Sequence, residues 1–195
     1  LGDNTWPQVV EEAILGGATF IQLREKNLSY DEFLKAAIEV KSVTDKYSVS
    51  FVINDNVDIA VKVGADGAHI GQGDEEIRAA REKLGPNKIL GISAGTLEEA
   101  IKAEKNGTDY LGVGAVFNTT TKLDARTVAF EALKEICENV KIPVVAIGGI
   151  SKDNVNELKQ TGIAGISVVS AIFAQDDVTT AAEELLNLTK QTLII

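Results

Sequence analysis

Apolar and polar positions along the chain follow two alternating patterns. Seven short runs rich in Val and Ile lack the regular apolar–polar alternation of a half-exposed strand, which is typical of strands buried on both faces of a parallel sheet. In four of them, a glycine that can end a helix precedes one or two small or polar residues and then the strand. The predicted strands lie within residues 16–25, 49–55, 63–72, 88–94, 106–116, 142–149 and 161–172.

Segments with helical periodicity fill the intervals between these runs. In residues 5–15, for example, an apolar face is formed by Val9, Val10, Ala13 and Ile14. Ser29 is placed to cap the following helix, and Thr96 with Glu99 three residues later forms a capping-box pattern. The eight predicted helices lie within residues 5–15, 30–43, 57–63, 74–84, 97–106, 128–140, 151–161 and 178–191.

This alternation predicts an α/β fold with a parallel sheet. No linker, low-complexity tract or change of composition divides the chain, so we expect residues 1–195 to form one domain. We favour a (β/α)8 TIM barrel. Because a helix comes first, we expect the first barrel strand to lie upstream and to be absent from this chain. The alternative is an open doubly wound sheet, but no glycine-rich dinucleotide-binding pattern follows an early strand.

Composition and charge narrow the function classes. The chain is 45% hydrophobic and has a net charge of −10, which argues against binding to nucleic acid or to anionic membrane surfaces. No apolar stretch approaches the roughly 20 residues that cross a bilayer, and residues 1–10 show no signal-peptide pattern. The single cysteine, Cys137, fits a reducing compartment, so we expect a cytoplasmic protein. The oligomeric state is left open.

Catalytic groups of a barrel collect at the carboxyl ends of its strands, and polar residues stand at these positions throughout the chain. Arg24, Lys26 and Lys122 are cations of the kinds that bind phosphate. Asp55 and Asp74 follow neighbouring strands and predict a Mg²⁺ site completed by phosphate oxygens and water. The strand-end residues are Gln22, Arg24, Lys26, Asn54, Asp55, Gln72, Asp74, Ser93, Thr119, Thr121, Lys122, Gly148, Gly149, Val169 and Ser170.

The last two strand ends predict a second anion site. Loops at these places often bind phosphate in barrels, and the backbone N–H groups around Gly148 and Gly149 can cradle a monophosphate.

Each motif also has a plainer interpretation. "REK" can be a surface charge run, "IND" can cap the next helix, and the glycine pair can be a simple tight turn. His69 is interpreted as packed or as supporting the site, and Cys137 as part of the core.

Taken together, the motifs identify a resemblance to the thiamine-phosphate synthase family. The resemblance runs along nearly the whole chain, with the motifs in family order. It is carried by "IQLREKN", "FVINDNVDIA", "VGADGAHIGQGD", "ILGISAGTLEEA", "DYLGVGAVFNTTTK", "IPVVAIGGI" and "GISVVSAIF". It implies a (β/α)8 barrel that joins a pyrimidine diphosphate to a thiazole monophosphate, carboxylated in many members, giving thiamine phosphate and diphosphate.

The resemblance also implies residue roles. Asp55 and Asp74 resemble the Mg²⁺ ligands, and Lys122, Arg24, Lys26 and Ser93 resemble the residues that carry catalysis. The expected contacts of the pyrimidine diphosphate are Gln22, Arg24, Lys26, Asn54, Ser93 and Lys122. The expected contacts of the thiazole phosphate are Thr119, Thr121, Gly149, Val169 and Ser170, with Gly148 as a neighbour.

The implied mechanism is dissociative: diphosphate leaves first, and the thiazole nitrogen then attacks a pyrimidine methylene cation.

The chain departs from the family at Gly95, where a histidine is usual, and at Ala115 and Asn118, which replace prolines. Two alternatives are kept. One is a TenI-like isomerase that aromatises the thiazole phosphate, and the other is a non-catalytic regulator that binds a phosphorylated metabolite.

Overall fold

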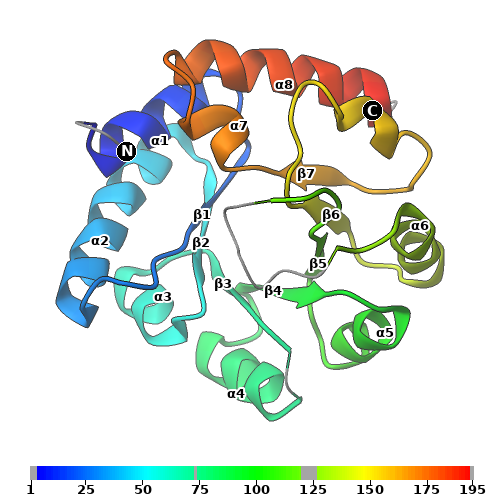
Figure 1. Ribbon diagram of the computed structural model, residues 1–195. Helices are drawn as coiled ribbons and strands as arrows, with labels where there is room; N and C mark the ends of the chain where they lie inside the picture. Colours follow the sequence, from blue (N-terminus) through cyan, green and yellow to red (C-terminus); the bar gives the residue numbers. More distant parts are fainter. Residues whose placement is uncertain (1–3, 73, 120–126, 194–195) are drawn as a thin grey trace.

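A seven-stranded parallel sheet forms the centre of the molecule. The computed structural model describes residues 4–72, 74–119 and 127–193, without the side chains of residues 74 and 75. The strands follow one another in sequence order, each hydrogen-bonded to the next, and curl into a half-barrel (Figure 1). They are β1 (Phe20–Leu23), β2 (Ser50–Asn54), β3 (Gly67–Ile70), β4 (Ile89–Ala94), β5 (Tyr110–Gly114), β6 (Val144–Ile147) and β7 (Gly165–Ser167).

Helices surround the sheet on its outer face (Figure 1). They alternate with the strands along most of the chain, so the predicted TIM-barrel-like α/β fold is confirmed. In the described part of the chain, no helix is both long and apolar enough to cross a membrane. The helices are α1 (Trp6–Leu15), α2 (Tyr30–Tyr47), α3 (Val57–Val63), α4 (Asp74–Leu84), α5 (Leu97–Lys105), α6 (Phe130–Asn139), α7 (Ser170–Phe173) and α8 (Val178–Leu193), with the 3₁₀ helix η1 (Val155–Leu158).

The two faces of the sheet differ in composition. Side chains such as Ile53, Leu90 and Leu111 are fully buried and belong to the apolar clusters that the helices cover. The strand residues that alternate with these apolar ones face the inside of the half-barrel. There, the His69 ring and the Tyr110 hydroxyl lie within hydrogen-bonding distance. Because successive side chains of a strand point to opposite faces, each strand contributes both to the apolar core and to a polar interior.

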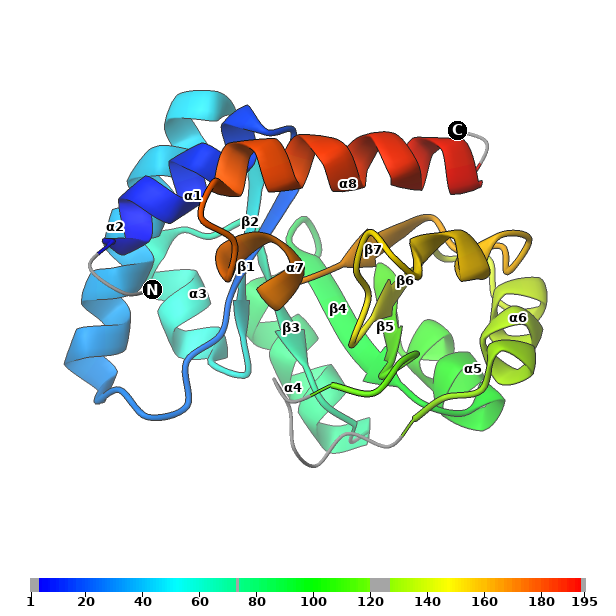
Figure 2. The same ribbon diagram turned by 45° about the horizontal axis from the view of Figure 1, so that its top comes forward.

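Helix α8 spans the two edges of the sheet. Within the described residues, no pairing joins β1 to β7. Near the start of α8, the Thr179 hydroxyl donates to the Glu12 carbonyl of α1 at 3.1 Å, and near its end, the Thr192 hydroxyl donates to Asn156 Oδ1 of η1 at 2.8 Å. Figure 2 shows α8 reaching from α1 across to the η1 side. The helix therefore connects the segments that flank both edges.

The predicted caps are confirmed with one difference. The Ser29 side chain accepts from the Glu32 N–H, and the Glu32 carboxylate accepts from the Ser29 N–H, which makes a complete capping box. The Thr96 hydroxyl likewise accepts from the Glu99 N–H at 3.2 Å. The Glu99 carboxylate, however, accepts from the N–H of Gly95, one residue before the cap.

Two element predictions are wrong in extent. Residues 151–161 contain only the single 3₁₀ turn η1, because Asn154 at φ −125° and Lys159 at ψ 136° lie outside helical backbone on either side of it, and Gln160 takes a left-handed φ of 65°. The strand expected within residues 161–172 stops at Ser167. The Val169 carbonyl accepts from the Phe173 N–H at 2.9 Å, so Ser170 begins the short helix α7 instead of ending a strand.

Candidate active site

Because all seven strands are parallel, their carboxyl ends lie at the same end of the half-barrel. Gln22 is within β1, and half-buried Arg24 and exposed Lys26 follow it. Asn54 ends β2 and pairs in register with His69 of β3. The predicted Thr121 and Lys122 lie outside the described residues, as does the side chain of Asp74, whose backbone begins α4. Their predicted roles are therefore untested by the structure.

Hydrogen bonds inside the half-barrel connect the predicted Ser93 to two neighbouring side chains. His69 Nδ1 lies 2.9 Å from Tyr110 Oη, and His69 Nε2 lies 3.0 Å from Ser93 Oγ. Ser93 is thus connected to Tyr110 through His69. The Gln72 side chain also donates to the Ser93 carbonyl, which fixes the backbone at the end of β4.

Tyr110 was not predicted as a site residue. It begins β5, and its ring lies edge-on to Phe20 and tilted against His69, with centroid distances of 5.7 and 5.4 Å. Burial raises the pKa of the Tyr110 phenol far above its usual range, and the neighbouring Gln22 side chain opposes this shift only in part. Tyr110 is therefore a neutral hydrogen-bonding group at any physiological pH.

The end of β2 has an unusual backbone. Asp55 adopts a left-handed φ of 63°, and its N–H donates to the His69 carbonyl at 2.8 Å. The following helix is capped by Asn56, whose side chain accepts from the Ile59 N–H at 3.0 Å. The plainer interpretation, in which "IND" caps this helix, is therefore wrong. Ser48 and Gln160 adopt the same left-handed region away from the strand ends, so the ligand role expected for the exposed Asp55 carboxylate remains a prediction.

The glycine pair after β6 packs tightly against the end of β5. Gly148 and Gly149 have φ values of 97° and 67°, a region that L side chains rarely adopt. A Cβ on Gly148 would lie 2.6 Å from the Cα of Ala115, and one on Gly149 would lie 2.4 Å from the Asn118 carbonyl oxygen. The pair is thus more than a simple tight turn, because it also allows two strand ends to approach each other.

Asn154 stabilises this turn and was not predicted. Its Nδ2 donates to the Gly149 carbonyl at 2.9 Å, and its Oδ1 accepts from the Ser151 N–H at 2.8 Å. The predicted Val169 and Ser170 are exposed beyond the end of β7, which pairs with β6. Thr119 is half-buried beyond the end of β5. These residues follow neighbouring strands, as a shared site at this end requires.

A metal site remains a prediction. Across residues 4–72, 74–119 and 127–193, no group of three or more His, Cys, Asp or Glu side chains is placed to hold a metal ion. Asp55 is the expected ligand whose side chain is described. Two carboxylates completed by phosphate oxygens and water are a common arrangement for Mg²⁺, so the donor types that the sequence supplies suit this ion.

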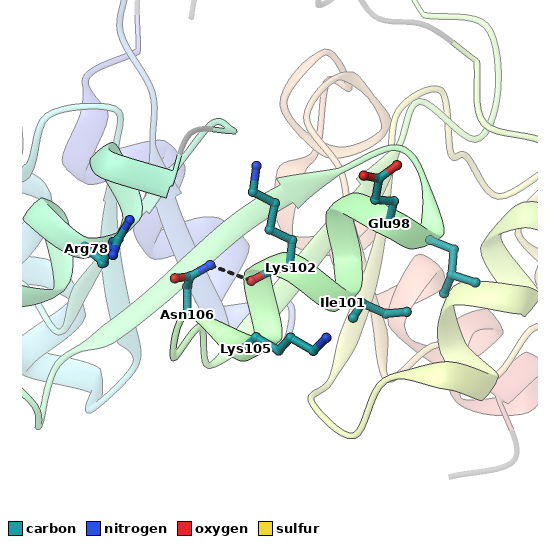
Figure 3. Close-up of a pocket in the computed structure, with 7 residues that line it drawn as sticks. Arg78, Glu98, Ile101, Lys102, Lys105 and Asn106 are labelled. Carbon is teal, nitrogen blue, oxygen red and sulfur yellow. Dashed lines mark hydrogen bonds between the residues drawn. The ribbon is translucent and has the colours of Figure 1, made fainter.

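A separate hollow lies on the outside of the molecule, between α4 and α5 (Figure 3). Its volume is about 600 Å³. Asn106 donates to the Lys102 carbonyl at its edge at 2.8 Å. It contains none of the predicted site residues and is lined by Arg78, Leu97, Glu98, Ile101, Lys102, Lys105 and Asn106. It therefore does not belong to the candidate active site.

Comparison with known proteins gives a consistent result. Residues 2–172 match the family described as thiamine monophosphate synthase. The thiamine-phosphate synthase of Ruminiclostridium cellulolyticum is 52% identical over 188 residues, which cover 96% of this chain and 90% of the relative. That of Clostridium tetani is 54% identical over 178 residues, covering 91% and 85%.

Solved structures agree with this result. Thiamine phosphate pyrophosphorylase from Pyrococcus furiosus has a TM-score of 0.88 and 46% identity to this chain, with 96% of this chain and 90% of that one covered. A 3-hexulose-6-phosphate synthase structure, at 17% identity and a TM-score of 0.72, shares the fold alone. The chain therefore belongs to the thiamine monophosphate synthase family.

Proposed function

We propose that this protein is a thiamine-phosphate synthase, which joins 4-amino-2-methyl-5-hydroxymethylpyrimidine diphosphate to thiazole phosphate and releases diphosphate. The observation that carries the proposal is the identity of about half of all residues to thiamine-phosphate synthases over nearly the full chain. The polar residues at the carboxyl ends of the strands support it, because the reaction needs two anionic groups bound close together.

One end of the proposed site binds the pyrimidine diphosphate. Arg24, Lys26 and Lys122 would contact its phosphates, since guanidinium and ammonium groups pair well with phosphate oxygens. Gln22, Asn54 and Ser93 would contact the pyrimidine side, and the burial of Asn54 suits a fixed polar contact. Asp55 and Asp74 would hold Mg²⁺, which neutralises negative charge on the diphosphate when it is bound.

The other end binds the thiazole phosphate. The left-handed conformations of Gly148 and Gly149 support an anion cradle, because such turns expose consecutive backbone N–H groups. Val169 and Ser170 would complete the cradle from the neighbouring strand end. Thr119 and Thr121 would contact the thiazole between the two anionic groups.

The reaction requires positioning and charge stabilisation more than covalent catalysis. As the bond to diphosphate breaks, negative charge develops on the leaving group, and Arg24, Lys26 and Lys122 stabilise that charge. The threonines and the glycine turn hold the thiazole nitrogen in line with the pyrimidine methylene carbon. The two reacting atoms are therefore already aligned when the new C–N bond forms. No side chain acts as a nucleophile in this proposal.

The test is incubation of the protein with both substrates and Mg²⁺, followed by chromatography of the products. We expect thiamine phosphate to form. Aromatisation of the thiazole phosphate without its joining to the pyrimidine would support the TenI-like isomerase instead. Binding of either phosphate ligand without any turnover would support the non-catalytic regulator.

A second prediction concerns Lys122. We expect Lys122→Ala to lower kcat far more than it weakens thiazole-phosphate binding, because this cation acts on the leaving diphosphate. A loss of about 100-fold or more is typical when one charge-stabilising group is removed from a transition state. Steady-state kinetics and calorimetric titration of thiazole phosphate measure the two effects. An unchanged kcat would contradict the role given to Lys122.

A further inference from the structure

We propose that Asn154 is a positioning residue for the phosphate of the thiazole substrate, because it orients the peptide between Gly149 and Ile150 so that the Ile150 N–H donates to that phosphate. Asn154 acts through this peptide and does not itself contact the ligand. The identity of the ligand rests on the proposed function, whereas the response of the Ile150 N–H to an anion can be tested with inorganic phosphate alone.

Two hydrogen bonds hold the Asn154 side chain against the turn that follows β6. Its Nδ2 donates to the Gly149 carbonyl at 2.9 Å, and its Oδ1 accepts from the Ser151 N–H at 2.8 Å. Both ends of one planar amide are used, a donor and an acceptor. Asn154 therefore fixes the two peptide groups on either side of Ile150 relative to each other.

The direction of the Ile150 N–H follows from the geometry of a peptide group. The bond between Gly149 and Ile150 is trans. In a planar trans peptide, the C=O and the N–H point in opposite directions. Because the Gly149 carbonyl is directed to Asn154, the Ile150 N–H is directed away from Asn154, to the side of the turn that this side chain leaves open.

The Ile150 N–H is a donor in need of a partner. Within residues 4–72, 74–119 and 127–193, it donates no hydrogen bond. Ile150 as a whole is 4% exposed, so water has little access to it. Buried backbone N–H groups are nearly always paired in folded proteins. An unpaired one that directly follows the left-handed Gly148 and Gly149 is suited to an anion, since such turns direct N–H groups towards one point.

The segment that carries Asn154 is itself anchored. Val155 and Leu158, the first and last residues of η1, are fully buried. Asn156 Oδ1 accepts from the Thr192 hydroxyl of α8 at 2.8 Å. Asn154 thus projects from a turn that is fixed by both the core and α8. A side chain held in this way can position a binding group precisely.

The first test uses the wild-type protein and nuclear magnetic resonance. We expect the Ile150 amide proton to move downfield when thiazole phosphate or inorganic phosphate is added, because a hydrogen bond to a phosphate oxygen deshields the proton. The Leu111 amide is the control and should not move, since it already donates to the Pro143 carbonyl at 2.9 Å at the amino end of β5. An Ile150 amide that moves with neither phosphate would overturn the proposal.

The second test uses Asn154→Ala. We expect thiazole phosphate to bind about tenfold more weakly, as loss of one hydrogen bond to a charged group typically gives, with KM for the pyrimidine diphosphate unchanged. The downfield movement of the Ile150 amide should be lost as well. Asn139→Ala is the matched control, because Asn139 Nδ2 donates to the Glu135 carbonyl at 2.8 Å on the exposed surface of α6. Calorimetric titration and steady-state kinetics measure these effects.

The outcomes separate two kinds of failure. Equal weakening of both substrates by Asn154→Ala would overturn the positioning role, because Asn154 would then support the fold in general. If the wild type forms no thiamine phosphate while its Ile150 amide still responds to inorganic phosphate, the proposed function fails and the anion contact stands. Urea unfolding shows whether the variant is folded, and the wild-type spectrum needs no variant at all.

Discussion

Gly148 and Gly149 show how individual residues form the proposed phosphate cradle. Both have a left-handed backbone, and both lie where a side chain would collide with the end of β5. Asn154 then fixes the turn through the Gly149 carbonyl and the Ser151 N–H. Conformation, close approach and a hydrogen-bonding side chain thus act together on one short segment.

The need for a left-handed backbone and the need for space at the glycine turn can be separated by experiment. Gly64 has nearly the same φ as Gly149, 68° against 67°, but no atom lies within 4 Å of an added Cβ. We expect Gly64→Ala to cost about 1–2 kcal/mol of the free energy of unfolding, the usual penalty for a left-handed alanine, and to leave KM unchanged. Gly149→Ala should lower the free energy of unfolding by more than Gly64→Ala and should raise the KM for thiazole phosphate. Urea unfolding and steady-state kinetics measure both. Equal stabilities with wild-type KM in both variants would contradict this account.

The sequence predicted some of these residues better than others. Gly148 and Gly149 were found because they follow one of the last two predicted strands, where barrels often bind phosphate. Tyr110 was missed because a tyrosine at the start of a strand is ordinary in a core. The available signal was spatial: Gly91 and Gly112 leave room on neighbouring strands for the ring next to His69. Such complementarity appears only after the strands are aligned in register.

At the scale of whole elements, one acidic side chain adds a charged contact between α1 and α2, which also pack through apolar residues such as Val9 and Phe33. The Glu11 carboxylate accepts hydrogen bonds from Lys46 and from the Tyr47 hydroxyl, both at 2.7 Å. The hydrogen bond from Lys46 is the largest cause of the lowered pKa of Glu11, followed by that from Tyr47. The two helices thus share a charged contact at the protein surface.

This contact predicts a pH dependence of stability. Because the folded pKa of Glu11 is lowered, its contribution is present above the ordinary value of 4.5 and is lost as pH falls through the folded value. We expect Glu11→Gln to be less stable than wild type at pH 7 and equal to it in acid. Thermal unfolding across pH measures the difference. The control is Glu39→Gln, whose carboxylate lies 4.0 Å from Lys35. A difference that persists in acid would argue against the contact.

Elements were predicted well where periodicity and caps agreed. Helix α2 begins at the residue after Ser29, as its capping box indicates. Residues 151–161 were misassigned because a helical spacing of apolar residues does not show where single residues, here Asn154 and Lys159, leave helical backbone. The end of β7 was misassigned because an apolar run fits a strand and a short buried helix equally well.

The whole molecule supports a site assembled from distant parts of the sequence. Seven parallel strands place their carboxyl ends together, and α8 connects the segments at the two edges of the sheet. On a chain with a net charge of −10, the proposed cluster of Arg24, Lys26 and Lys122 would be a local group of cations. A local excess of cations on an acidic protein is well suited to concentrate phosphorylated substrates.

The central claim is that this site joins two phosphorylated substrates. Phosphorus magnetic resonance of one reaction, with both substrates and Mg²⁺ present, follows diphosphate and thiamine phosphate together. The account predicts that the two products appear one for one when both substrates are present. Release of diphosphate without an equal amount of thiamine phosphate, or no release with both substrates present, would contradict it.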